Sequence, residues 1–137
     1  MDRELIEAKL EALRQFVERI RSKTPATVDG LAGDADLQDI ISVNLERAVQ
    51  VCVDIAAHII AESDEPPPTT MGASFDALHR LGVVPAEMAL QMKRAVGFRN
   101  ISVHAYQSVD WALVYEIITT RLDDFRRFAA AVAEELD

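Results

Sequence analysis

Apolar residues recur every three or four positions along much of the chain, which is the spacing of amphipathic helices. The first predicted helix runs from about Asp2 to Arg21, and one of its faces carries Ile6, Leu10, Leu13, Phe16 or Val17, and Ile20. The sequence Ser22-Lys23-Thr24-Pro25 is expected to end it, because a residue that precedes proline is driven away from helical backbone angles. Residues from Pro25 to Gly33 are predicted to form a loop.

The second predicted helix extends from about Asp34 to Glu62, with Asp34 or Asp36 as its cap. Its apolar positions keep the helical period throughout: Leu37, Ile41, Leu45, Ala48, Cys52, Ile55 and Ile59. The polar residues form a narrow stripe: Arg47, Gln50, Asp54 and His58. A helix that is apolar on most sides is buried on most sides, so we expect this helix at the centre of the fold.

Proline and glycine divide the rest of the chain. Ser63 to Thr70 contains three consecutive prolines and is predicted to be an extended surface loop. Ser74 is expected to cap a short helix over Phe75 to Leu81, which Gly82 closes.

Two further helices are predicted after this turn. Pro85 suits the first turn of a helix from Ala86 to about Phe98 or beyond. Asp110 is expected to cap a final helix that reaches the C-terminus, with one apolar face: Trp111, Val114, Ile118, Leu122, Phe125, Ala129, Val132 and Leu136. The absence of any strand pattern, with long helices and few glycines, predicts an all-α, up-and-down helical bundle that forms one domain over residues 1–137.

Composition narrows the class of protein. No apolar run approaches the roughly 20 residues of a membrane helix, and the N-terminus does not resemble a signal peptide, so we expect a cytoplasmic protein that is not bound to a membrane. Cys52 is the single cysteine, which excludes an internal disulfide, and its apolar neighbours indicate a buried, inert thiol. The net charge of −9 argues against a broad nucleic-acid-binding surface but permits one small basic site.

The helix that begins after Pro85 carries the candidate chemistry. Arg99 falls in the middle of its apolar sector, which also holds Met88, Met92, Ala95, Val96 and Val103. Lys93, Asn100 and His104 cluster about 140° away on a regular helix. Either the helix ends or bends inside this motif, or the site is completed by a second chain across a two-fold axis.

These side chains suit RNA cleavage without a metal or cofactor. His104 can exchange a proton with a ribose 2′-hydroxyl or with the leaving oxygen, and Arg99 can stabilise the charge on the phosphate. Asn100 can orient the histidine, and no carboxylate pair or histidine cluster lies nearby in the sequence to bind a metal. Spacing alone leaves open a purely structural role for the arginine and the histidine.

The run Phe98-Arg99-Asn100-Ile101-Ser102-Val103-His104-Ala105-Tyr106 resembles the Arg-x4-His-x-Tyr signature of the HepT toxins, which are ribonucleases of the HEPN class. The flanking residues 85–97 and 109–118, and Cys52 to Ile60, are similar to the same family. The resemblance implies a homodimer in which two such motifs face one RNA-cleaving cleft. It also implies a neighbouring antitoxin of the minimal nucleotidyltransferase (MNT) type, which transfers AMP from ATP to the motif tyrosine, Tyr106.

Three residues are weaker candidates for lining the cleft: Lys93, Asp54 and His58. Asp54 and His58 lie four residues apart and share a helix face, so they either line the cleft or satisfy each other within the bundle, and we favour the structural role. The alternative function is a non-catalytic HEPN module that binds a nucleotide or a partner nucleotidyltransferase.

Overall fold

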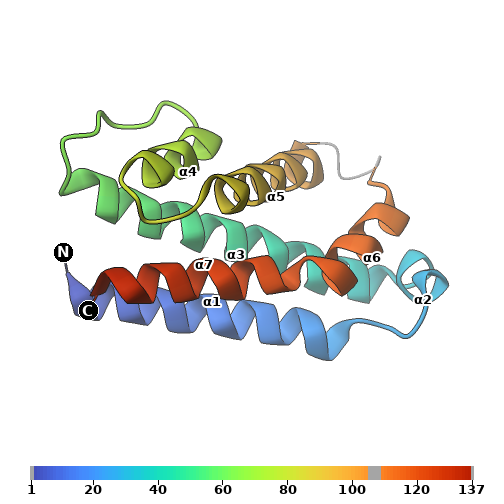
Figure 1. The fold of residues 1–137 in the computed structure, drawn as a ribbon. Coiled ribbons are helices and arrows are strands. Elements are labelled where there is room, and N and C mark those ends of the chain that lie inside the picture. The colour runs from blue at the N-terminus through green and yellow to red at the C-terminus, as the bar shows by residue number, and fades with distance from the viewer. Residues whose placement is uncertain (1, 105–108, 137) are drawn as a thin grey trace.

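The computed structural model describes the backbone of residues 2–104 and 109–136, and the side chains of the same residues except 101–104. Its helices are α1 (Arg3–Lys23), α2 (Val28–Ala32), α3 (Ala35–Ala61), α4 (Met71–Arg80), α5 (Ala86–His104), α6 (Trp111–Thr120) and α7 (Leu122–Leu136). Within these residues no strand is present, which confirms the predicted all-α class. Figure 1 shows α1, α3 and α7 running along the length of the bundle, with α4 and α5 packed across one side of it.

The central position predicted for the second helix is correct. Asp34 caps α3 by accepting a hydrogen bond from the backbone N–H of Leu37 (3.1 Å). The helix packs against α1, α4 and α5 and buries residues on most of its circumference. Cys52 is fully buried on this helix, and burial, with a smaller contribution from Asp54, raises the pKa of its thiol well above the ordinary value.

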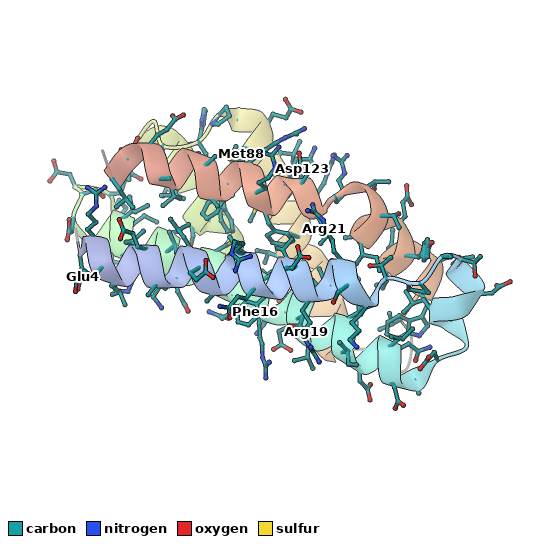
Figure 2. All side chains as sticks on the ribbon, turned by 90° about the horizontal axis from the view of Figure 1, so that it is seen from below. Glu4, Phe16, Arg19, Arg21, Met88 and Asp123 are labelled. Atoms are coloured by element: carbon teal, nitrogen blue, oxygen red, sulfur yellow. The ribbon has the colours of Figure 1, made fainter. Side chains whose placement is uncertain are left out.

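The helices α1 and α7 meet along their lengths, so the two ends of the chain lie close together (Figure 1). Figure 2 shows Arg21 of α1 and Asp123 of α7 on these neighbouring helices. A hydrogen bond from Arg126 lowers the pKa of the Asp123 carboxyl, with smaller contributions from Arg127 and Arg21. On the buried side of α7, Phe128 contacts Phe75 of α4 edge to face, with 5.7 Å between the ring centroids.

Two predicted boundaries were wrong because local capping differs from the prediction. The loop predicted between Pro25 and Gly33 contains α2, where Thr27 accepts a hydrogen bond from the N–H of Gly30 (3.2 Å) and Leu31 is fully buried. The short helix α4 begins at Met71 rather than Phe75.

The cap of α4 is therefore Thr70, whose hydroxyl accepts from the N–H of Ala73 (3.1 Å), while Ser74 is buried inside the helix. Gly82 closes this helix as predicted, with a positive φ of 79°, and Val83 donates back to the carbonyl of Leu78 (2.9 Å).

The final helix predicted after Asp110 is two helices. Asp110 does cap α6, but α6 stops at Thr120 and α7 begins at Leu122. The hydroxyls of Thr119 and Thr120 bond to main-chain carbonyls of the preceding turn, including that of Glu116, and such bonds compete with the helical ladder. The break at Arg121 therefore turns α6 away from the line of α7.

Candidate active site

The motif lies on α5, which is helical without interruption from Ala86 to His104. The helix therefore does not end between Arg99 and His104. A regular helical register places these two positions about 140° apart around α5. The continuous helix excludes an end of α5 inside the motif, whereas completion of the site by a second chain stays a prediction.

Arg99 points from α5 toward the other helices and is only 20% exposed. Its Nη2 lies 3.6 Å from Oε1 of Glu46 on α3, and its Nη1 contacts Sδ of Met71 on α4 at 3.8 Å. The apolar stripe thus receives a guanidinium whose charge is partly balanced by a carboxylate. The sequence prediction did not include Glu46; its only signal was an acidic side chain at the edge of the apolar face of α3.

Asn100 and Lys93 lie on the more exposed side of α5. The amide oxygen of Asn100 accepts a hydrogen bond from Nη1 of Arg99 (3.3 Å), so the two motif residues are linked. Lys93 forms an ion pair with Asp76 of α4, with 3.2 Å between Nζ and Oδ2. Lys93 therefore secures α4 to α5, close to the motif along the helix.

Asp54 and His58 are placed on α3, toward a different neighbour. Asp54 accepts a hydrogen bond from Gln50 (3.0 Å), and its carboxylate lies 4.0 Å from Nζ of Lys9 on α1. His58 is exposed. Because these contacts of Asp54 are made at the α1–α3 boundary, they give no support to a role in the cleft, which remains a prediction.

The structure describes only the backbone of the motif histidine and does not describe the motif tyrosine. His104 is the last residue of α5, and its side chain lies outside the described residues. Tyr106 lies wholly outside them. Their roles in catalysis and modification therefore remain predictions.

The chain becomes locally basic around the motif, although the whole protein is acidic. From Met88 to Val109 it contains Lys93, Arg94 and Arg99 but no aspartate or glutamate. This run was readable in the sequence, yet the prediction weighed only the total charge. It makes α5 a helix suited to meeting a phosphate backbone.

Two features are absent from the described residues. No group of three histidine, cysteine, aspartate or glutamate side chains is close enough to hold a metal ion there. In the same part of the chain, no helix has both the length and the apolar character needed to span a membrane.

Known proteins resemble this chain over nearly its full length. The mRNA nuclease HepT of Shewanella oneidensis is 29% identical over 96% of this chain and 98% of its own length. The tRNA nuclease HepT of Aphanizomenon flos-aquae is 24% identical over 88% of this chain and 82% of its own. A solved structure of the tri-AMPylated Shewanella oneidensis HEPN toxin in complex with its MNT antitoxin superposes with a TM-score of 0.90, at 28% identity, over 98% of this chain and 99% of that one.

These similarities confirm the resemblance inferred from the motif and support the expected class of activity, a ribonuclease. The model of one family, described as ribonuclease HepT-like, matches residues 6–132. That match covers most of α1 through α7, including the whole of the motif helix. The chain therefore belongs to the ribonuclease HepT-like family.

Proposed function

We propose that this protein is a metal-independent endoribonuclease toxin that cleaves RNA at a site formed by Arg99 and His104 in a homodimer. The observation that carries the proposal is the position of Arg99, which is held on an otherwise apolar face by Glu46 and Met71 and linked to Asn100. Burying a charged group is costly unless the group is paired, and the planar guanidinium of Arg99 suits a phosphate. The nuclease names of the relatives agree with this reading.

The reaction follows from these side chains. His104 accepts the proton of a ribose 2′-hydroxyl while the 2′-oxygen attacks the adjacent phosphorus. The bond from phosphorus to the 5′-oxygen breaks, and the leaving oxygen takes a proton from the second histidine of the dimer. The products are a 2′,3′-cyclic phosphate and a 5′-hydroxyl. Arg99 stabilises the negative charge that builds on the phosphoryl oxygens.

The outer face of α5 supports the dimer. Leu90 is 46% exposed there, although it is a large apolar side chain. A second copy of α5 crossing this face would cover Leu90 and bring its own motif to the same cleft. Two chains would thereby bring together positions that one helix holds about 140° apart.

Regulation by a nucleotidyltransferase antitoxin is the second part of the proposal, with Tyr106 as the acceptor of AMP. The protein has two tyrosines, and the hydroxyl of the other, Tyr115, donates a hydrogen bond to the carbonyl of Pro25 (2.9 Å). An AMP group on Tyr106 would place an anionic phosphate two residues from His104, where it competes with RNA for Arg99. The solved complex of a relative pairs a tri-AMPylated toxin with an MNT antitoxin, which agrees with this mode of control.

The decisive test is cleavage of RNA by the purified protein in EDTA. The unmodified protein should cut RNA and leave a 2′,3′-cyclic phosphate, and His104→Ala should be inactive. Arg99→Lys should also be impaired, because the lysine ammonium is a point charge and cannot donate the paired hydrogen bonds of a planar guanidinium. His79→Ala, at an exposed histidine of α4, is the matched control and should stay active.

Two outcomes would contradict the mechanism: strict dependence on Mg²⁺, and full activity in His104→Ala. A further arm, His58→Ala, tests the predicted cleft-lining role of that residue.

A further inference from the structure

A pocket of about 390 Å³ lies on the side of α5 opposite to α4, between α3, α5, α6 and α7. Its inner wall is apolar and includes Leu45, Val49, Phe98, Leu113, Ile117 and Phe125. The volume falls in the lower part of the range of about 300–1,000 Å³ typical of ligand sites. Leu113 is 45% exposed, so a large apolar side chain stands at the opening in contact with water.

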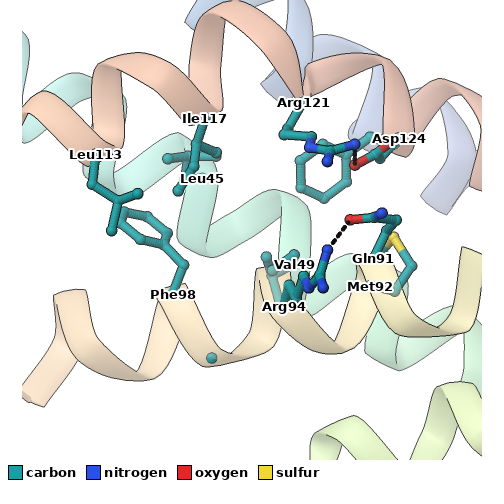
Figure 3. A pocket seen from close by; sticks show the side chains of 13 residues that line it. Leu45, Val49, Gln91, Met92, Arg94, Phe98, Leu113, Ile117, Arg121 and Asp124 are labelled. Atoms are coloured by element: carbon teal, nitrogen blue, oxygen red, sulfur yellow. Dashed lines mark hydrogen bonds and ion pairs between the residues drawn. The ribbon is translucent and has the colours of Figure 1, made fainter.

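The pocket has an apolar end and a charged end (Figure 3). Phe98 and Leu113 lie at one end, nearer to the motif along α5. At the other end Arg94 comes from α5 and Arg121 from the opposite wall, where α6 stops. One of the two arginines, Arg121, is thus the residue at the break between α6 and α7.

Both arginines are held only loosely by protein partners. The Nη1 of Arg94 lies 3.5 Å from the amide oxygen of Gln91, and the Nη1 of Arg121 lies 4.0 Å from Oδ2 of Asp124. Asp124 is the acidic residue of the lining, and its carboxylate also lies 3.9 Å from Arg127. The two guanidiniums therefore give the charged end a net attraction for an anion.

We propose that this pocket is a subsite for one unpaired base of a single-stranded RNA, with Arg94 and Arg121 contacting the phosphate next to it. Single-stranded RNA offers a planar base that packs on aromatic and aliphatic side chains and a phosphate at a fixed distance from it. Phe98 directly precedes Arg99, so the subsite and the motif share one rigid helix. The inference rests on the proposed ribonuclease function and adds the part of the substrate that is bound away from the scissile bond.

The subsite has a geometric consequence for cleavage. Ten residues of helix separate Arg94 from His104, a rise of about 15 Å. The phosphate bound by Arg94 therefore lies a few nucleotides from the scissile phosphate. Such a subsite positions the strand along α5 without taking part in the chemistry.

The test measures binding in the His104→Ala background, so that RNA is not cut. The probes are a fluorescein-labelled oligouridylate and an oligomer of the same length that lacks its bases, each titrated by fluorescence anisotropy at several salt concentrations. The protein should prefer the oligouridylate by about tenfold. Leu113→Trp, which fills the exposed mouth of the pocket, should remove this preference.

The role of the two arginines is tested by the salt dependence of RNA binding. Arg94→Gln and Arg121→Gln should each weaken binding and reduce the slope of log affinity against log salt by about 0.7, the contribution of one phosphate contact on a single strand. Arg19→Gln makes the same change of charge on the outer side of α1 (Figure 2) and should leave the slope as it is. A 4-thiouridine probe should crosslink to the tryptic peptide of residues 95–99, which contains Phe98.

The outcomes separate this inference from the proposed function. Binding that is unaffected by Leu113→Trp and both arginine variants would overturn the subsite, even where cleavage still depends on His104. If the wild-type chain cuts no RNA but the pocket variants lose affinity, the proposed reaction fails and the subsite stands. If Leu113→Trp changes the oligomeric state in light scattering without changing RNA affinity, the pocket belongs to an interface between copies and the inference is wrong.

Discussion

The guanidinium of Arg99 on α5 lies 3.6 Å from the carboxylate of Glu46 on α3, and the two residues are 53 positions apart in the chain. The contact joins the motif helix to the central helix of the bundle. It also places a negative charge beside the group that is proposed to bind the scissile phosphate. Glu46 therefore restrains Arg99 and at the same time lowers its attraction for an anion.

Glu46→Gln should separate these two effects. Because the substitution removes a competing negative charge, we expect RNA to bind several-fold more tightly, with a steeper dependence on salt. Stability should change by less than about 1 kcal/mol, since the Glu46 side chain is 42% exposed and such pairs contribute little. Glu134→Gln, at an exposed position of α7, is the control for net charge. Weaker RNA binding in Glu46→Gln would show that Glu46 chiefly positions the arginine.

Leu90→Glu should break the proposed dimer. A carboxylate on the exposed face of α5 would be buried between two copies without a partner, which is unfavourable. We expect light scattering to report a monomer, RNase activity to fall with it, and the circular dichroism of the helices to be unchanged. Val28→Glu, at another exposed apolar residue, should leave both properties intact. A monomer with undiminished activity would remove the argument for a shared site.

Modification should be confined to Tyr106. The tryptic peptide of residues 100–121 contains both tyrosines, so fragmentation is needed to assign the site. Co-expression with the cognate nucleotidyltransferase should add about 329 Da, the mass of one AMP group, or a multiple of it. Tyr106→Phe should remain toxic and escape the antitoxin, whereas Tyr115→Phe should still be modified. An unmodified Tyr106 in the neutralised pair would favour inhibition by binding alone.

Gly82 should be intolerant of a side chain although there is room for one. A Cβ there would meet nothing within 4 Å, but the φ of 79° is unfavourable for any L-residue. Gly82→Ala should therefore reduce the free energy of unfolding by about 1 kcal/mol or more. Gly72→Ala, within α4, would bring its Cβ into ordinary contact with Lys93 at 3.7 Å and should be neutral or stabilising. Urea denaturation of both variants measures the difference, and equal midpoints would contradict the backbone argument.

The elements that the sequence predicted correctly are those specified by local interactions. Hydrophobic period and a capping aspartate located α3, and a glycine with positive φ ended α4. The motif was also visible because Arg99 and His104 lie close together on one helix. Capping bonds and helical periodicity involve residues a few positions apart, so a single sequence contains the information for them.

Only the tertiary structure decided which distant residues meet. The apolar face from Trp111 to Leu136 has a continuous period, and nothing in that period marks the break at Arg121. The pairing of Arg99 with Glu46, and the pocket between α5 and the α6–α7 junction, depend on how the helices pack. Periodicity specifies which face of a helix is buried, but it does not specify which neighbour covers that face, because many apolar partners bury the same area equally well.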